Sequence, residues 1–183
     1  MRFLVTVFTS AALLGCSTSA SPLEVRQDGL QPFEVTAVNS YSPSGRPGSD
    51  VWRHMRANIT DPNSYFYTST NRNLTVPGDS QGINCEARWY RGESPLDRTW
   101  PCDPAPNGHW ALQVVSSGVY DFKLRFIHAV EPGLSWPNTR YEAEASFKSG
   151  ENLIGRCLSS GSCSYSLGAD CNKSTTRTPE WYP

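Results

Sequence analysis

The stretch "YDFKLRFIH", residues 120–128, carries the clearest structural signal in the sequence. One set of alternate positions is apolar: Tyr120, Phe122, Leu124 and Phe126. The positions between them are charged: Asp121, Lys123 and Arg125. A period of two residues places the two sets on opposite faces of a β-strand, so this stretch predicts a strand with one face in a core and the other in water.

The same period recurs on both sides of this stretch, in residues 51–59, 83–89, 110–114 and 141–147. In the second of these segments, we expect the inward set to be Ile83, Cys85, Ala87 and Trp89. Gly- and Pro-rich turn signals separate the segments, and no long stretch shows the apolar spacing of an amphipathic helix. The pattern predicts an all-β fold, a single antiparallel β-barrel or sandwich.

The N-terminus resembles a secretory signal. Arg2 is followed by apolar or small residues to Leu14, and small residues at Thr18 and Ala20 suit a signal peptidase. We expect residues 1–20 to be a signal peptide of a secreted, extracellular protein, residues 21–30 a flexible leader, 31–168 the β-barrel domain and 169–183 a C-terminal tail. Lipid attachment at Cys16 is an alternative use of the same segment.

Charge and hydropathy limit the classes of partner. The formal net charge is −1, which offers no electrostatic attraction for nucleic acid. No apolar run after the N-terminal segment reaches the length of a membrane span. We therefore expect neither nucleic acid nor membrane as a partner.

The cysteines are expected to form structural cross-links. Cys85 and Cys102 enclose 16 residues, and a disulfide closing such a loop contributes roughly 3 kcal/mol in the loop-entropy model. Cys157 and Cys163 enclose five residues that include a glycine, which suits a tight turn between two strands. A reactive thiol at Cys85 or Cys102 is disfavoured, because an oxidising compartment promotes pairing. A bond between Cys163 and Cys171 is the local alternative, and it would leave Cys157 unpaired.

An odd number of cysteines remains after removal of the signal peptide. Cys171 is the expected unpaired residue, and it predicts a disulfide-linked homodimer. Glycosylation sequons begin at Asn58, Asn73 and Asn172. A glycan at Asn172 would crowd the neighbouring sulfur and disfavour the dimer.

Several segments together resemble the major Alternaria allergen family. They are "FEVTAVNSYSP", "NITDPN", C-x-A-x-W from Cys85, "WPC", and the terminal "CLSSGSCSYSL". Members of this family are small secreted fungal proteins, several of which are described as elicitors or effectors of plant defence. The resemblance spans residues 31–168 and implies an antiparallel β-barrel with disulfides matching Cys85–Cys102 and Cys157–Cys163. The family's intersubunit cysteine lies near the N-terminus, whereas the spare cysteine here is Cys171.

Candidate catalytic residues are few. His54, His109 and His128 stand on separate segments without metal-binding spacing, so we expect no metal and no cofactor. His128 is expected to be a structural histidine held by hydrogen bonds at the end of the barrel. Glu142 and Glu144 share a strand face and could act as paired carboxylates in glycoside hydrolysis. Flanking Arg140 and Lys148 favour a solvated outer row instead.

A small ribonuclease using His128, Arg140 and Glu142 is a further alternative, but no contiguous catalytic motif supports an enzyme. Exposed aromatic side chains, above all Trp100 and Trp136, would mark a carbohydrate-binding module if their rings were coplanar. The favoured interpretation is a secreted non-enzymatic fungal protein, allergen-like or effector-like, that binds a host protein or a small ligand. The alternatives are a carbohydrate-binding module for cell-wall polysaccharide, or a small secreted hydrolase or ribonuclease.

Overall fold

The computed structural model describes residues 29–69, 72–106, 108–133, 136, 138–169, 173–174 and 176–180. The strands in these residues are β1 (Glu34–Ser42), β2 (Trp52–Asp61), β3 (Tyr65–Ser69), β4 (Arg72–Val76), β5 (Ser80–Tyr90), β6 (Thr99–Pro101), β7 (Gly108–Ser117), β8 (Asp121–Val130), β9 (Thr139–Lys148), β10 (Leu153–Cys157), β11 (Cys163–Leu167), β12 (Lys173–Ser174) and β13 (Thr176–Glu180). This part of the chain contains no helix long and apolar enough to cross a membrane.

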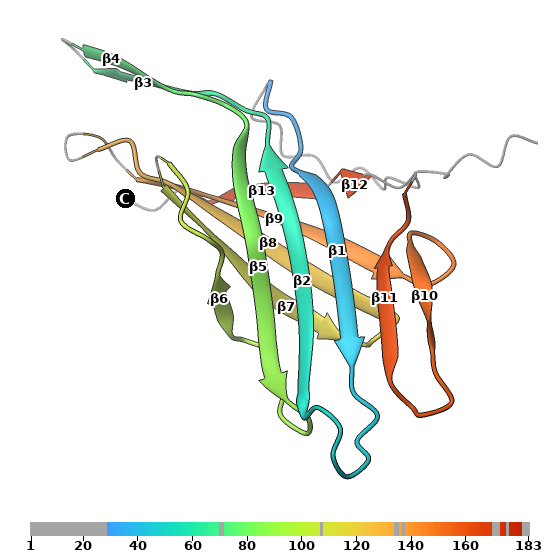
Figure 1. Ribbon diagram of the computed structural model, residues 1–183. Coiled ribbons are helices and arrows are strands. Elements are labelled where there is room, and N and C mark those ends of the chain that lie inside the picture. Colours follow the sequence, from blue (N-terminus) through green and yellow to red (C-terminus); the bar gives the residue numbers. More distant parts are fainter. Residues whose placement is uncertain are drawn as a thin grey trace, which may run out of the picture.

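The strands form two antiparallel sheets and a separate hairpin (Figure 1). The first sheet has the order β10-β11-β1-β2-β5, with β12 beside β1, and the second has the order β13-β9-β8-β7-β6. Figure 1 shows the strands of one sheet crossing behind those of the other, while the β3–β4 hairpin projects from one end. The all-β prediction is confirmed as a sandwich. The closed barrel implied by the family resemblance is not formed, because each sheet keeps its own edge strands.

The core lies between the two sheets and is built by the alternation seen in the sequence. From the second sheet, Phe122, Leu124, Phe126 and Phe147 are completely buried. The first sheet contributes the buried residues Val35, Val38, Met55, Ala57, Ile59, Cys85, Ala87 and Trp89. Apolar side chains from both sheets thus form one continuous cluster, which is the main source of stability in such a fold.

Tyr120 and Ile83, which the alternation predicted to face the core, are exposed. Tyr120 is 59 % exposed because it precedes β8, which begins at Asp121. Ile83 is 41 % exposed because a β-bulge shifts the register between β2 and β5. At the bulge, Asn84 takes a left-handed conformation with φ of 53°, and its backbone N–H donates to Asn58 Oδ1 at 3.0 Å.

The bulge reverses which residues of β5 face the core. On its N-terminal side, Gly82 is buried and Ser80 is half-buried on the same face. A side chain at Gly82 would clash, because a Cβ there would lie 2.9 Å from both Ile59 Cγ2 and Trp110 Cγ. The extra residue at Asn84 is therefore what directs Ser80 towards the interior.

Both disulfides expected from the sequence are present. Cys85–Cys102 joins β5 of the first sheet to the residue after β6 of the second, so it fastens the two sheets together. Cys157–Cys163 closes the hairpin of β10 and β11, where the two cysteines face each other.

Part of the segment predicted as a C-terminal tail pairs with the two sheets. Lys173–Ser174 pairs with β1, and Thr176–Glu180 pairs with β9 at the edge of the second sheet. Threonines favour strands, and Pro179 is tolerated there because an edge strand has one unpaired side. The predicted signal peptide, most of the leader, Cys171 and Asn172 lie outside the described residues.

Candidate functional site

Asp61 ends β2 inside the core, where it is completely buried. It occupies the next inward position after Ile59, so the alternation that builds the core also carries a carboxylate into it. A buried carboxylate requires hydrogen bonds in place of its lost hydration. The turn that follows supplies two of them: Asn63 donates to Oδ1 from its backbone N at 3.0 Å and from Nδ2 at 2.7 Å.

The other oxygen of Asp61 holds a histidine. Tyr65 donates its hydroxyl hydrogen to Oδ2, and His128 Nδ1 lies 2.9 Å from the same atom. Because a carboxylate only accepts hydrogen bonds, Nδ1 of His128 carries a hydrogen. The imidazole also stacks on the Trp110 indole with ring centroids 4.2 Å apart and an interplanar angle of 3°. The ring is therefore fixed in orientation, with Nε2 on the side away from Asp61.

Ser80 occupies that side. Its Oγ lies 3.2 Å from His128 Nε2 and accepts a hydrogen bond of 3.1 Å from Trp110 Nε1. An indole N–H only donates, so with a neutral imidazole the serine hydrogen points to Nε2. Asp61 and Ser80 come from β2 and β5 of the first sheet, and His128 comes from β8 of the second, so the hydrogen bonds link the two sheets. We call Asp61, Asn63, Tyr65, Ser80 and His128 the inner cluster.

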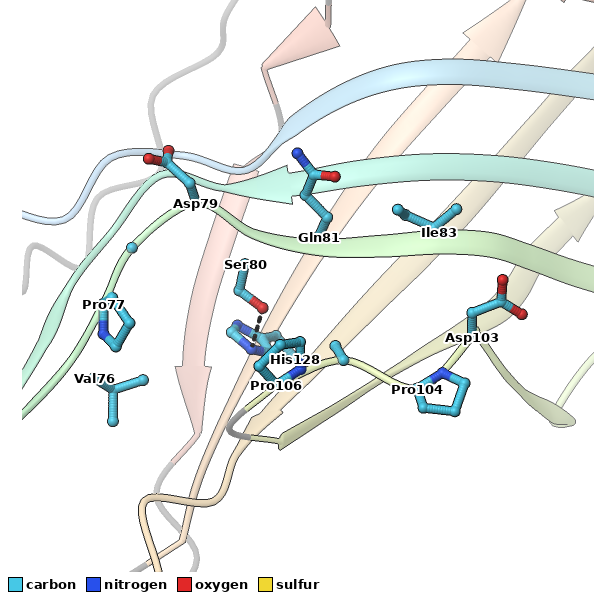
Figure 2. A pocket seen from close by; sticks show the side chains of 12 residues that line it. Val76, Pro77, Asp79, Ser80, Gln81, Ile83, Asp103, Pro104, Pro106 and His128 are labelled. Atoms are coloured by element: carbon cyan, nitrogen blue, oxygen red, sulfur yellow. Dashed lines mark hydrogen bonds between the residues drawn. The ribbon is translucent and has the colours of Figure 1, made fainter.

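A pocket of about 450 Å³ opens beside the inner cluster, where β5 begins. Figure 2 shows Ser80 and His128 hydrogen-bonded to each other, with Pro77 and Pro106 beside them. The pocket is lined by Val76, Pro77, Gly78, Asp79, Ser80, Gln81, Ile83, Asp103, Pro104, Ala105, Pro106 and His128. Its volume falls within the range of small-molecule pockets, and its walls are more apolar than polar.

The rim of the pocket carries negative charge. Asp79 and Asp103 are exposed, and their carboxylates point away from His128 in Figure 2. Asp103 accepts a 2.6 Å hydrogen bond from Asn84, while Asp79 has a φ of 61° at the turn into β5. None of the described lining residues is Lys or Arg. The mouth therefore favours neutral or cationic molecules over anions.

The outer face of the first sheet combines aromatic and polar side chains. Trp52 and Tyr90 face each other across β2 and β5, with ring centroids 6.0 Å apart and nearly perpendicular planes. The Arg88 guanidinium lies 4.7 Å from the Trp52 ring centroid, a cation–π contact. Further along the same face is a groove of about 390 Å³, lined by Ala37, Val38, Asn39, Arg56, Ala57, Asn58, Asn84 and Glu86.

His54 lies between these two halves of the outer face. Its ring stacks on Tyr41 with centroids 5.1 Å apart. Burial and the nearby Arg56 guanidinium lower the pKa of His54 below its ordinary value. The imidazole therefore stays neutral to lower pH than a free histidine.

The Glu142 and Glu144 carboxylates lie in an ion-pair row on the outer face of the second sheet. Arg125 contacts Glu144 at 2.8 Å and Glu142 at 3.7 Å, and Arg140 pairs with Glu142. Glu142 is buried, which a solvated row did not predict. The inward-facing neighbour Tyr141 pairs with His128 across the sheet. The ribonuclease arrangement is therefore not assembled, since His128 faces the interior and Arg140 and Glu142 face outwards.

The remaining predicted site residues are scattered. Trp100 on β6 is partly buried beneath Arg98, whereas Trp136 contacts Tyr67 of the β3–β4 hairpin. Different neighbours thus surround the two rings, and the structure does not bring them together as a platform. Asn73 is exposed on β4, while Asn58 is half-buried beside the outer groove.

Asp61 and Ser80 were missed by sequence reasoning. For Asp61 a signal existed, because it continues the odd-numbered inward positions of residues 51–59. For Ser80 the signal was hidden, because its inward direction depends on the bulge at Asn84. His128 was identified, and its expected hydrogen bonding is confirmed.

Comparison with known proteins gave no match. No protein-family model, no curated protein and no solved structure matches the chain.

Proposed function

We propose that the protein is a secreted binding protein that holds a small ligand in the pocket over Ser80. The observation that carries this proposal is the pocket of about 450 Å³ with a hydrogen-bonded serine and histidine among its lining residues. Two disulfides are compatible with an oxidising extracellular compartment. Recognition of a host protein, in an effector-like or allergen-like role, rests on the family resemblance alone.

The lining defines the chemistry of the ligand. Val76, Pro77, Pro104 and Pro106 offer rigid apolar walls for an apolar body. The Ser80 hydroxyl is a single fixed hydrogen-bonding group beside them. Because Asp79 and Asp103 are on the rim, the ligand is neutral or cationic. Since the Ser80 hydrogen points to His128 Nε2, Ser80 Oγ can only accept from the ligand, which therefore carries at least one hydrogen-bond donor.

NMR of the tryptophan indole groups tests the proposal. Trp110 Nε1–H donates to Ser80, so a ligand that reaches Ser80 should shift the Trp110 indole signal. A library of neutral and cationic small molecules is screened for that shift. Pro77→Trp, which fills the pocket, should abolish the response, whereas Leu158→Trp on the exposed β10–β11 turn should preserve it. Shifts that persist in Pro77→Trp, or a library without any shift, would contradict the proposal.

A carbohydrate-binding function is a second candidate, favoured by the outer face of the first sheet. Exposed Trp52 and Tyr90 offer aromatic surface to a sugar ring. The adjacent groove offers the amides of Asn39 and Asn58 and the charged groups of Arg56 for sugar hydroxyls. Trp100 and Trp136, the pair expected from the sequence, are not part of this face.

Sedimentation with insoluble glucan, chitin and cellulose tests the second candidate. The protein should be retained on one polysaccharide, and Trp52→Ala should release it. Pro77→Trp is the matched control, because it alters the pocket and leaves the outer face unchanged. A wild-type protein that stays in the supernatant with all three polysaccharides would rule this candidate out.

A further inference from the structure

The inner cluster has the hydrogen-bond order of a nucleophilic serine site. Asp61 Oδ2 lies 2.9 Å from His128 Nδ1, and His128 Nε2 lies 3.2 Å from Ser80 Oγ. A serine becomes a nucleophile when an adjacent base accepts its hydrogen and a third group orients that base. We propose that Ser80, with His128 as general base and Asp61 as positioning residue, is an acylation site for small neutral or cationic carboxylic esters.

The imidazole is prepared to act as a base. Asp61 accepts hydrogen bonds from Asn63 and Tyr65 as well, so its own position is fixed. The carboxylate holds the hydrogen of His128 on Nδ1 and stabilises the imidazolium that forms when Nε2 takes a second proton. Trp110 stacks beneath the ring and prevents it from turning away from Ser80.

The pocket gives an ester access to Ser80. Both Ser80 and His128 line it, and Pro77 and Pro106 provide apolar surface for an acyl chain (Figure 2). The acidic rim disfavours substrates that carry a carboxylate or phosphate. The substrate class is therefore an ester of a short apolar acid with a neutral or cationic alcohol.

The chemical step balances with water as the co-reactant. Ser80 Oγ forms a bond to the carbonyl carbon, its proton passes to His128 Nε2, and the carbonyl π electrons move to oxygen. Collapse of this adduct breaks the bond to the alkoxide, which leaves with the proton from Nε2. Water then attacks the acyl-serine, with Nε2 again taking and returning a proton, and the carboxylic acid is released.

The inference goes beyond the binding function and departs from the expectation of a non-enzymatic protein. That expectation rested on contiguous motifs, whereas these three residues are separated by 19 and 48 positions in the chain. The binding function does not require acylation, because a ligand can occupy the pocket without an ester group.

A fluorophosphonate probe tests the site in the disulfide-bonded protein. Reaction forms a bond from Ser80 Oγ to phosphorus, releases fluoride and transfers the serine proton to His128. Peptide mapping should place the label on Ser80. Ser80→Ala should remove it, and Ser64→Ala, a nearby exposed serine without a histidine partner, should retain it.

His128→Gln should slow labelling of Ser80 by about 100-fold or more, the usual contribution of a general base. Circular dichroism and retention of both disulfides verify that each variant is folded. If His128→Gln does not fold, hydrolysis of p-nitrophenyl butyrate by wild type and Ser80→Ala decides, with loss of activity expected in Ser80→Ala. Absence of label on Ser80 in folded wild type overturns the inference, as does equal hydrolysis by both proteins.

The Trp110 indole shift keeps the two proposals separable. Wild-type protein in which ligands shift the Trp110 indole signal and the probe labels Ser80 supports both proposals. A ligand response in folded wild type without a label on Ser80 contradicts the acylation site and leaves the binding function standing. Loss of the ligand response in wild type, with Ser80 still labelled, contradicts the binding function and leaves the acylation site standing.

Discussion

The inner cluster and the outer ion-pair row use similar side chains in opposite environments. Asp61 has no exposed side-chain area, whereas 35 % of the Glu144 side chain is exposed. Asp61 accepts from fixed donors on Asn63, Tyr65 and His128, while Glu144 is paired with the long side chains of Arg125 and Lys123. Water can replace the partners of Glu144 but cannot easily reach Asp61. The hydrogen bonds of Asp61 therefore have a fixed geometry, whereas those of Glu144 can be replaced by hydrogen bonds to water.

The difference also separates structural from chemical roles. An exposed ion pair contributes up to about 1 kcal/mol and is screened by salt. A buried carboxylate that loses its partners is much more costly, and the same rigidity can position a base for chemistry. The comparison predicts that removing a side chain of the inner cluster lowers the free energy of unfolding much more than removing one of the outer ion-pair row.

The largest effect is expected for Asp61→Ala. Removal of this carboxylate takes away the buried acceptor that Tyr65, Asn63 and His128 share. The free energy of unfolding should fall by roughly 3–5 kcal/mol, as for other broken buried pairs. Urea unfolding measures it, with Glu144→Ala as the matched outer variant expected to lose about 1 kcal/mol or less. Equal losses in the two variants would break the comparison.

Ser80→Ala is expected to have an intermediate effect. It removes the hydrogen-bond partner that Ser80 provides to Trp110 Nε1–H and to His128 Nε2 beside the pocket. A buried group deprived of its hydrogen bond costs roughly 1–3 kcal/mol, so the variant should be less stable but folded. Thermal unfolding of Ser80→Ala and Ser64→Ala checks this, because Ser64 is exposed and accepts a hydrogen bond from the Gly78 backbone N at 3.0 Å. A larger loss in Ser64→Ala would contradict the assignment of Ser80 to the inner cluster.

The fold was predictable from sequence to the extent that period-two alternation is a local property. Phe122, Leu124 and Phe126 took their predicted inward positions, as did Tyr141 and Phe147. The sandwich could not be distinguished from a barrel, because closure depends on which edge strands pair and not on alternation. The wrong assignments arose where a local irregularity interrupts the period, at the Asn84 bulge and before β8.

The candidate site was less predictable than the fold. Its three central residues lie on three strands of two sheets, so no spacing in the sequence connects them. Asp61 could have been identified as inward-facing by extending the alternation of β2 by one step. The hydrogen-bonded arrangement of Asp61, His128 and Ser80 could not have been predicted in this way. It depends on the register of β2 with β5 and on the packing of one sheet on the other.

A smaller effect on stability is expected from Glu144 in the outer ion-pair row, and this effect should depend on pH. Burial disfavours ionisation of Glu144, but hydrogen bonds and charge from Arg125 and Lys123 outweigh it and lower its pKa from the ordinary 4.5. A lowered carboxyl pKa stabilises the fold above the unfolded-state value and loses that contribution as pH falls through the folded-state value. Glu144→Gln should therefore lower the melting temperature slightly at pH 7 and have less effect near pH 3. A larger effect at the acidic pH would reverse the sign and refute the ion-pair account.

The smallest effect on stability is expected from His54, which lies on the outer face of the first sheet, whereas His128 is buried in the core. Burial and the charge of Arg56 lower the pKa of His54 below 6.5, whereas Glu86 and Asp50 act in the opposite direction. Folding disfavours the imidazolium, so His54 reduces stability as pH falls below 6.5. NMR titration of its ring protons should show a pKa below 6.5 in wild type. Arg56→Gln should raise that pKa, because it removes the positive charge that, after burial, is the largest cause of the lowering. Arg88→Gln is the matched control with a weaker influence, so a greater rise there than in Arg56→Gln would show that the outer face is arranged differently.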